Sequence, residues 1–142
     1  MEWVHDRYTI TTDPNAIDRD AVGRFLAASY WATNRPRTII ERSLDNSLTF
    51  GLFHGGSQVG MARVVTDYAT FAWLCDVFIE PAHRGSGIGK WLLSVVFDHP
   101  MLQGFRIWLL GTSDAHGLYA QFGFTELPDP GRFMIRRDPP GR

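Results

Sequence analysis

One stretch, residues 71–98 with the sequence FAWLCDVFIEPAHRGSGIGKWLLSVVFD, constrains the fold more than any other part of the chain. Nearly every residue from Phe71 to Ile79 is apolar or aromatic, which predicts a strand buried on both faces. Pro81 ends this strand because proline has no N–H to donate to a sheet. A glycine-rich turn follows, and from Ile88 apolar residues recur with the spacing of a helix that lies on a sheet. The stretch therefore predicts a strand, a tight turn and an amphipathic helix in direct succession.

The glycine-rich turn is a candidate anion site. The helix is expected to begin inside the turn, so its first N–H groups have no intrahelical partner and carry the positive end of the helix dipole. The spacing Gly85-x-Gly87-x-Gly89 fits neither the Walker loop nor the dinucleotide-binding pattern. For the turn taken alone, a tight connection without a ligand remains the alternative.

The bulk properties exclude several classes of protein. A chain of 142 residues fits a single domain, and we predict one domain over residues 1–142 with a disordered tail at 138–142. The net charge of −1, without a basic cluster, gives no reason to expect binding to nucleic acid or to a membrane surface. The apolar runs are too short to span a bilayer and the N-terminus lacks a signal core, which predicts a cytoplasmic location. The single cysteine, Cys75, is expected to be a small buried hydrophobe.

The rest of the chain predicts further elements on both sides of this stretch. Asp18 or Asp20 is expected to cap the first helix, and the glycines at 55 and 56 predict a hairpin turn. The strand after the glycine loop is reached through a helix, so it should run parallel to the strand before it. The expected strands are 8–12, 47–53, 58–66, 105–110 and a closing pair at 124–127 and 132–137, and the expected additional helices begin near 18, 36 and 112.

Two motifs together resemble a known family. Arg84-x-x-Gly87-x-Gly89, preceded by Glu80-Pro81, resembles the acetyl-coenzyme A pyrophosphate loop of the GNAT superfamily of N-acetyltransferases. The later segment AHGLYAQFGF at 115–124 resembles the second signature of that superfamily. The resemblance implies an α/β fold of GNAT type, an acyl-CoA acyltransferase fold. Its mixed central sheet has about six to seven strands, splayed between the fourth and fifth, and about four helices.

The resemblance also implies which residues bind the donor, acetyl-CoA. The backbone N–H groups of the loop would hold the pyrophosphate, and the backbone of the preceding strand would bond the pantetheine amides like an added strand. At Thr112 many relatives carry an asparagine, so a pantetheine contact from this side chain is not implied. The implied donor-binding residues are Val77, Phe78, Ile79, Arg84, Gly85, Ser86, Gly87, Ile88, Gly89 and Lys90.

Three residues are candidates for the catalytic chemistry. Tyr119 matches the family's acid, which protonates the leaving thiolate; reference pKa values of about 10 and 8.5 make this transfer uphill by roughly 2 kcal/mol. The alternative for Tyr119 is a core aromatic. Asp76, a lone carboxylate in an apolar strand, could deprotonate or bind an ammonium group, or could be the structural partner of Arg63. His116, three residues before the tyrosine, is either a proton shuttle or a surface residue.

The acceptor is expected to be the primary amine of a small molecule, attacked directly and without a metal. Aromatic and charged residues in two connections would wall its pocket, although the aromatics could also complete the core. The alternatives are a non-catalytic acyl-CoA-binding regulatory or sensor module, and a nucleotide-phosphate binder outside the family; a homodimer is left open. The predicted substrate-binding residues are Tyr30, Trp31, Asn34, Asp67 and Tyr68.

Overall fold

The computed structural model describes residues 1–138 and divides the chain into two compact units, Met1–Leu110 and Gly111–Arg142. The first unit contains all six strands found in the described residues, and the second contains one short helix and a 3₁₀ turn. The elements of the first unit are β1 (Glu2–His5), β2 (Tyr8–Thr11), α1 (Arg19–Ala28), α2 (Arg37–Asp45), β3 (Leu48–His54), β4 (Ser57–Thr66), β5 (Phe71–Ile79), a 3₁₀ turn (Pro81–His83), α3 (Ile88–Asp98) and β6 (Ile107–Leu110).

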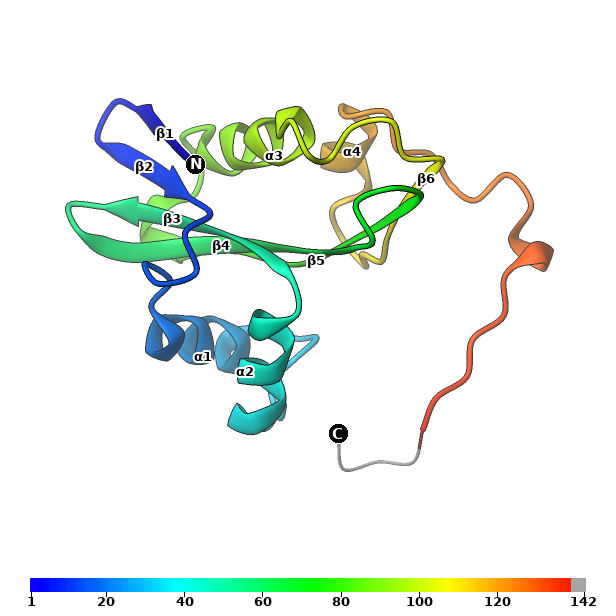
Figure 1. Ribbon diagram of the computed structural model, residues 1–142, viewed down its shortest axis with the longest axis horizontal. Helices are drawn as coiled ribbons and strands as arrows, with labels where there is room; N and C mark the ends of the chain where they lie inside the picture. The colour runs from blue at the N-terminus through cyan, green and yellow to red at the C-terminus, as the bar shows by residue number, and fades with distance from the viewer. Residues whose placement is uncertain (139–142) are drawn as a thin grey trace. The chain divides into compact units, whose positions relative to one another are not determined.

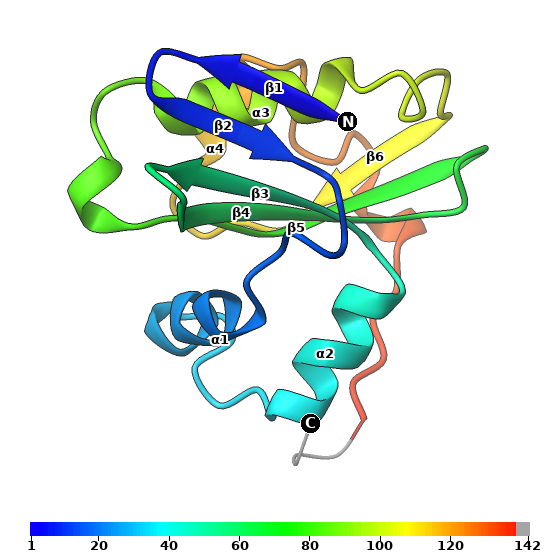
Figure 2. The ribbon, with the colours of Figure 1, turned by 60° about the vertical axis from the view of Figure 1, so that its left-hand side comes forward.

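The first unit is one mixed sheet with helices on both faces. Its strands lie in sequence order from β1 to β6; each neighbouring pair is antiparallel except β5 and β6, which are parallel as the sequence predicted. In Figures 1 and 2, α3 lies on one face of the sheet, and α1 and α2 lie on the other. The expected fold class, a mixed sheet of GNAT type with four helices, is confirmed.

The first helices pack through the stripe that the sequence predicted. Asp18 caps α1 by accepting a hydrogen bond from the backbone N–H of Ala21 at 3.0 Å. Val22 and Phe25 are buried against the sheet, and the Phe25 ring stacks on Phe78 of β5 with centroids 5.1 Å apart. This packing fixes the α1–α2 connection close to the middle of β5.

The N-terminal hairpin was not predicted from the sequence. Only the strand at 8–12 was expected, yet β1 pairs with β2 over Glu2–His5. The turn between them contains Asp6 and Arg7, and Asp6 takes a left-handed φ of 56° without any glycine. Because the strongest hairpin signals contain glycine, this turn carried no recognisable sequence signature.

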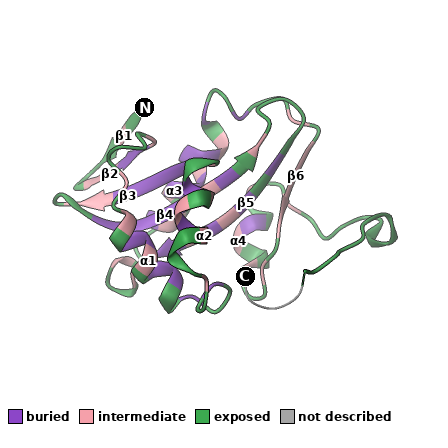
Figure 3. Ribbon diagram, turned by 60° about the horizontal axis from the view of Figure 1, so that its bottom comes forward, coloured by how far each residue is buried: buried purple, intermediate pink, exposed green. Residues whose placement is uncertain are grey.

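The prediction that β5 is buried on both faces was wrong. Phe71 and Trp73 are exposed, whereas Ala72 and Leu74 between them are buried. The register pairs Trp73 with Val65 of β4, which is also exposed, so α1 and α2 leave this part of the sheet uncovered. Figure 3 shows the same alternation of green and purple along the first half of β5.

The closing strands at 124–127 and 132–137 are absent from the described residues, and this prediction was wrong as well. The second unit has α4 (His116–Ala120) before this segment and a 3₁₀ turn at Pro130–Arg132 within it. Residues 125–138 are all exposed, so a strand pair there would lack the buried face that stabilises a small sheet. The predicted tail, except for residue 138, lies outside the described residues. Within residues 1–138 the structure contains no helix long and apolar enough to cross a bilayer.

Candidate active site

The centre of the candidate site is a bulge in β5. Met61 of β4 pairs with Phe78 and Arg63 pairs with Cys75, so the single residue Ala62 lies opposite two residues of β5. One of these two, Asp76, has a left-handed φ of 52°. A bulge changes the alternation of side chains along a strand. The bulge thereby turns the Asp76 side chain toward the α1–α2 connection.

Beyond the bulge, β5 loses its neighbour. In the described residues, β6 pairs with β5 only over Phe71–Leu74, and β6 ends at Leu110. The second half of β5, from Cys75 to Ile79, therefore has a backbone edge without a β6 partner. Such an edge can hydrogen-bond an extended ligand as an added strand. The predicted splay between these two strands thus begins at Cys75.

The glycine turn leads from this edge into α3. Gly85 and Gly87 have φ values of +85° and +83°, which side chains other than glycine rarely adopt, and Gly87 is the N-cap of α3. The first helical bond runs from Trp91 N–H to the Gly87 carbonyl at 3.0 Å, and no side chain caps the helix. The N–H groups of the first turn have no intrahelical partner, which is the geometry of an anion site at a helix start.

Side chains anchor the start of the turn to the sheet. Arg84 Nε donates to the Ile79 carbonyl at 2.7 Å, and its guanidinium lies over the Phe78 ring at 5.3 Å. The Tyr8 hydroxyl is 2.7 Å from Nδ1 of His83, which immediately precedes Arg84. Tyr8 and His83 were missed in the sequence, because Tyr8 is far from the motif along the chain. These anchors hold the loop in place before a ligand binds.

Asp76 is the hub of an ion-pair network. Its Oδ2 accepts hydrogen bonds from Arg63 Nε and from Arg35 Nη1, each at 2.9 Å. Its Oδ1 accepts one from Trp31 Nε1 at 2.9 Å, although Asp76 is only 5% exposed. The expected pairing of Asp76 with Arg63 is confirmed. Arg63 also donates to the Ser47 hydroxyl at 2.8 Å, which extends the network to the start of β3.

The network determines the charge state of the two titratable groups at the bulge. Burial alone would raise the pKa of Asp76, but the neighbouring charges of Arg63 and Arg35 outweigh it and leave that pKa below its usual value. Burial raises the pKa of the Cys75 thiol to about 11, so the thiol is neutral near pH 7. Asp76 is thus ionised near pH 7, and Cys75 is not an activated nucleophile.

The predicted acceptor-binding residues lie in two places. Trp31 bonds Asp76, and the Tyr30 ring meets the Trp31 ring edge-on with centroids 5.1 Å apart. Asn34 is exposed in the same connection. Tyr68 instead lines a pocket at the start of β3. Of the three residues in the α1–α2 connection only Trp31 bonds Asp76, and Tyr30 packs on Trp31, whereas Tyr68 belongs to the β4–β5 turn.

Asp67 has a structural position in the β4–β5 turn. Its carboxylate accepts hydrogen bonds from the Thr70 hydroxyl and from the backbone N–H groups of Ala69, Thr70 and Phe71. The bond from the Thr70 hydroxyl, followed by the backbone bonds, lowers the pKa of Asp67. These bonds explain Asp67 as a turn-forming residue without any substrate.

The candidate acid lies in the second unit. Tyr119 is 8% exposed, and its ring packs against Phe124 with centroids 6.0 Å apart. His116 is exposed at the first residue of α4. The Thr112 hydroxyl accepts the backbone N–H of Ala115 at 3.1 Å, but Ala115 itself is the N-cap of α4 and no side chain caps this helix, so the cap that the sequence suggests at residues 112–114 is not formed. The sequence motif is therefore built on a short helix that begins at His116.

Comparison with known proteins agrees with this geometry. The model of the acetyltransferase (GNAT) family matches residues 14–124. Protein FG08082 of Gibberella zeae, which carries the name of an acetyltransferase, is 32% identical over 140 residues, covering 82% of this chain and 78% of that protein.

Solved structures also match. A crystal structure from Xanthomonas campestris pv. campestris, described as an acetyltransferase of the GNAT family, has a TM-score of 0.90 and 46% identity, covering 94% of this chain and 95% of that one. A GNAT acetyltransferase from Elizabethkingia anophelis with acetyl-CoA bound has the same fold, with a TM-score of 0.66 and 15% identity over 85% of this chain and 78% of that one.

Proposed function

Since the chain belongs to the acetyltransferase (GNAT) family and is an acyltransferase, we propose that it transfers an acetyl group from acetyl-CoA to the primary amine of a small molecule. Acetyl-CoA supplies the activated thioester, and the amine attacks it directly. The observation that carries the proposal is the direct succession of a free β5 edge, a glycine turn and an uncapped helix start.

The donor is held by backbone groups in this proposal. The N–H groups of residues 85–90 bind the pyrophosphate, and residues 77–79 bind the pantetheine amides along the free edge of β5. The positive φ of Gly85 and Gly87, with no neighbouring atom within 4 Å of a Cβ built there, supports close approach of a phosphate. Arg84 stabilises the turn through its side-chain bond to Ile79, while its own backbone N–H is already used by the Pro81 carbonyl at 3.2 Å.

Tyr119 is the proposed general acid. It donates its phenolic proton to the thiolate that leaves when the thioester carbon–sulfur bond breaks, while the amine nitrogen forms the new amide bond. The family match includes Tyr119, and its burial against Phe124 supports a fixed ring orientation. His116 is the proposed route by which the amine loses its proton, since an exposed imidazole can exchange protons with water.

Asp76 acts as a positioning residue rather than a base in this proposal. Its lowered pKa keeps it ionised, and three of the roughly four acceptor sites of a carboxylate are already used. The carboxylate instead orients Trp31 and Arg35. The Arg35 side chain is 22% exposed and retains further N–H donors, which suits an acceptor that carries a carboxylate beside its amine, such as an amino-acid derivative.

The test is an acetylation assay over a panel of small amines and amino-acid derivatives that monitors release of free thiol. We expect turnover with at least one amine, and a fall in kcat of about 10²- to 10⁴-fold in Tyr119→Phe, the usual contribution of a general acid. Tyr8→Phe, which loosens the anchor of the donor loop at His83, is the matched control: it should raise the KM for acetyl-CoA while kcat stays within a few-fold of wild type. An unchanged kcat in Tyr119→Phe would refute the acid role. Coenzyme A binding without turnover across the panel would favour a non-catalytic acyl-CoA-binding module.

A further inference from the structure

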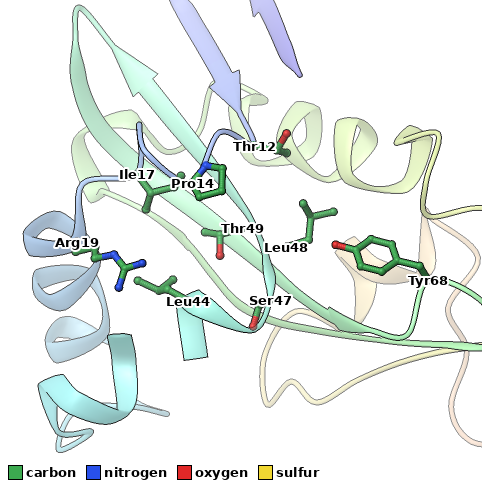
Figure 4. A pocket seen from close by; sticks show the side chains of 9 residues that line it. All are labelled: Thr12, Pro14, Ile17, Arg19, Leu44, Ser47, Leu48, Thr49 and Tyr68. Atoms are coloured by element: carbon green, nitrogen blue, oxygen red, sulfur yellow. The ribbon is translucent and has the colours of Figure 1, made fainter. Parts of the chain in front are cut away.

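A second pocket lies on the α1–α2 face of the sheet, at the start of β3. Figure 4 shows its walls, which come from the segment after β2, the first turn of α1, the end of α2, the start of β3 and the β4–β5 turn. Its volume is about 170 Å³, similar to cavities of about 150 Å³ that accept benzene. The lining residues are Thr12, Pro14, Ile17, Arg19, Leu44, Ser47, Leu48, Thr49 and Tyr68.

The Thr49 hydroxyl is a polar group of this pocket that is available to a ligand. Its side-chain hydroxyl is buried and has no hydrogen-bond partner in the described part of the chain, and the residue is 7% exposed. The neighbouring Ser47 hydroxyl is already used, because it donates to the Ser43 carbonyl and accepts from Arg63. An unsatisfied buried hydroxyl costs about 1–3 kcal/mol, so a molecule in the pocket that bonds Thr49 is favoured.

The charges around the pocket argue for an uncharged occupant. Arg19, the one charged lining residue, pairs with Asp45 at 2.5 Å and with Glu41 at 3.6 Å. Glu41 also lies 3.8 Å from Arg37, which pairs with Asp20, so three carboxylates oppose two guanidinium groups beside the pocket and an anion is unfavourable here. The Thr49 hydroxyl and the Tyr68 hydroxyl, which points toward the pocket in Figure 4, can each donate to a carbonyl oxygen on the ligand.

The remaining lining residues determine the size and the apolar character of a ligand that the pocket can hold. Pro14, Ile17, Leu44 and Leu48 are apolar and surround the polar groups. We propose that this pocket binds a small uncharged molecule with one carbonyl acceptor and a short apolar body, of about six to eight non-hydrogen atoms. The site is separate from the glycine turn, and its binding does not depend on acetyl transfer.

The pocket wall is connected to the Asp76 network. Ser47 accepts a hydrogen bond from Arg63 Nη1, and Arg63 Nε donates to Asp76. Thr49 is also the direct partner of Arg63 in the β3–β4 register. A ligand bonded to Thr49 therefore lies beside the arginine that holds Asp76, and the Arg63 Nε–H resonance should report its binding.

The experiment is an NMR titration of the ¹⁵N-labelled full chain with N-methylpropionamide, with propionate as a charged probe of similar size. We expect saturable shifts of the amide signals of residues 47–49 and 68 and of Arg63 Nε–H, and weaker binding of propionate. Thr49→Val should weaken binding of the amide by about 3- to 10-fold, the worth of one hydrogen bond, whereas Thr49→Ser should retain it.

A second measurement, the Tm of Thr49→Val, tests the unsatisfied hydroxyl separately from ligand binding. If the Thr49 hydroxyl is unsatisfied in the free protein, Thr49→Val should raise the Tm without the probe, because it removes a buried donor that lacks an acceptor. No saturable shift, equal affinity of Thr49→Val and wild type for the amide, or a lower Tm of Thr49→Val would overturn the proposal. A lower Tm would mean that water already satisfies this hydroxyl.

Discussion

The two halves of the candidate site, both built on β5, form binding groups in opposite ways. Toward the C-terminal end of β5, the strand edge, the turn and the start of α3 present backbone groups from one contiguous segment, residues 77–90. At the bulge, Asp76 gathers side chains from the α1–α2 connection and from β4. The backbone half depends on glycine conformations, whereas the side-chain half depends on charge pairing across the fold. Mutations should therefore separate the two halves.

Removing the hub of the side-chain half should have the largest effect. Asp76→Ala leaves two arginine charges without their partner in a largely buried position, which typically costs about 3–5 kcal/mol of unfolding free energy. Asp45→Ala removes an exposed partner of Arg19 and should cost about 1 kcal/mol or less. Urea denaturation measures both. Equal costs would show that the network does not hold the bulge.

The pH dependence of stability should come from the same carboxylate. The folded pKa of Asp76 is lowered, so its stabilising contribution is present above its unfolded pKa and is lost as the pH falls through the folded value. The stability gap between wild type and Asp76→Asn should be constant from about pH 5 to 8 and should shrink below about pH 4. Urea denaturation across this pH range measures the gap. A gap that grows toward acid would contradict the lowered pKa.

In the backbone half, the sensitive residue is Gly87. Gly87→Ala places a Cβ in a left-handed conformation at a cost of about 1–2 kcal/mol, so affinity for coenzyme A should fall by about 10-fold as the turn changes shape. Gly23→Ala in α1, where the added Cβ meets only the flexible tip of Arg37, is the control and should keep wild-type affinity. Calorimetric titration with coenzyme A measures both variants.

The same contrast explains what the sequence could reveal. The strand, the turn and the start of α3 at Ile88 were predicted correctly, because periodicity and glycine spacing are local signals. The ion pair of Asp76 with Arg63 was foreseen as an alternative from their mid-strand positions. The bulge, the Trp31 bond to Asp76 and the unpaired Thr49 hydroxyl could not be predicted, because each depends on register between segments distant in the chain. The β1–β2 hairpin was missed because its turn has no glycine.

The central claim is that the donor site is made of backbone and the acceptor side is made of side chains. Calorimetric titration of coenzyme A into wild type, Gly87→Ala and Trp31→Phe tests it most directly. Trp31→Phe removes one hydrogen bond to Asp76 and nothing from the turn, so its affinity should lie within about two-fold of wild type, while Gly87→Ala loses about 10-fold. Equal losses in the two variants, or a larger loss in Trp31→Phe, would contradict this division.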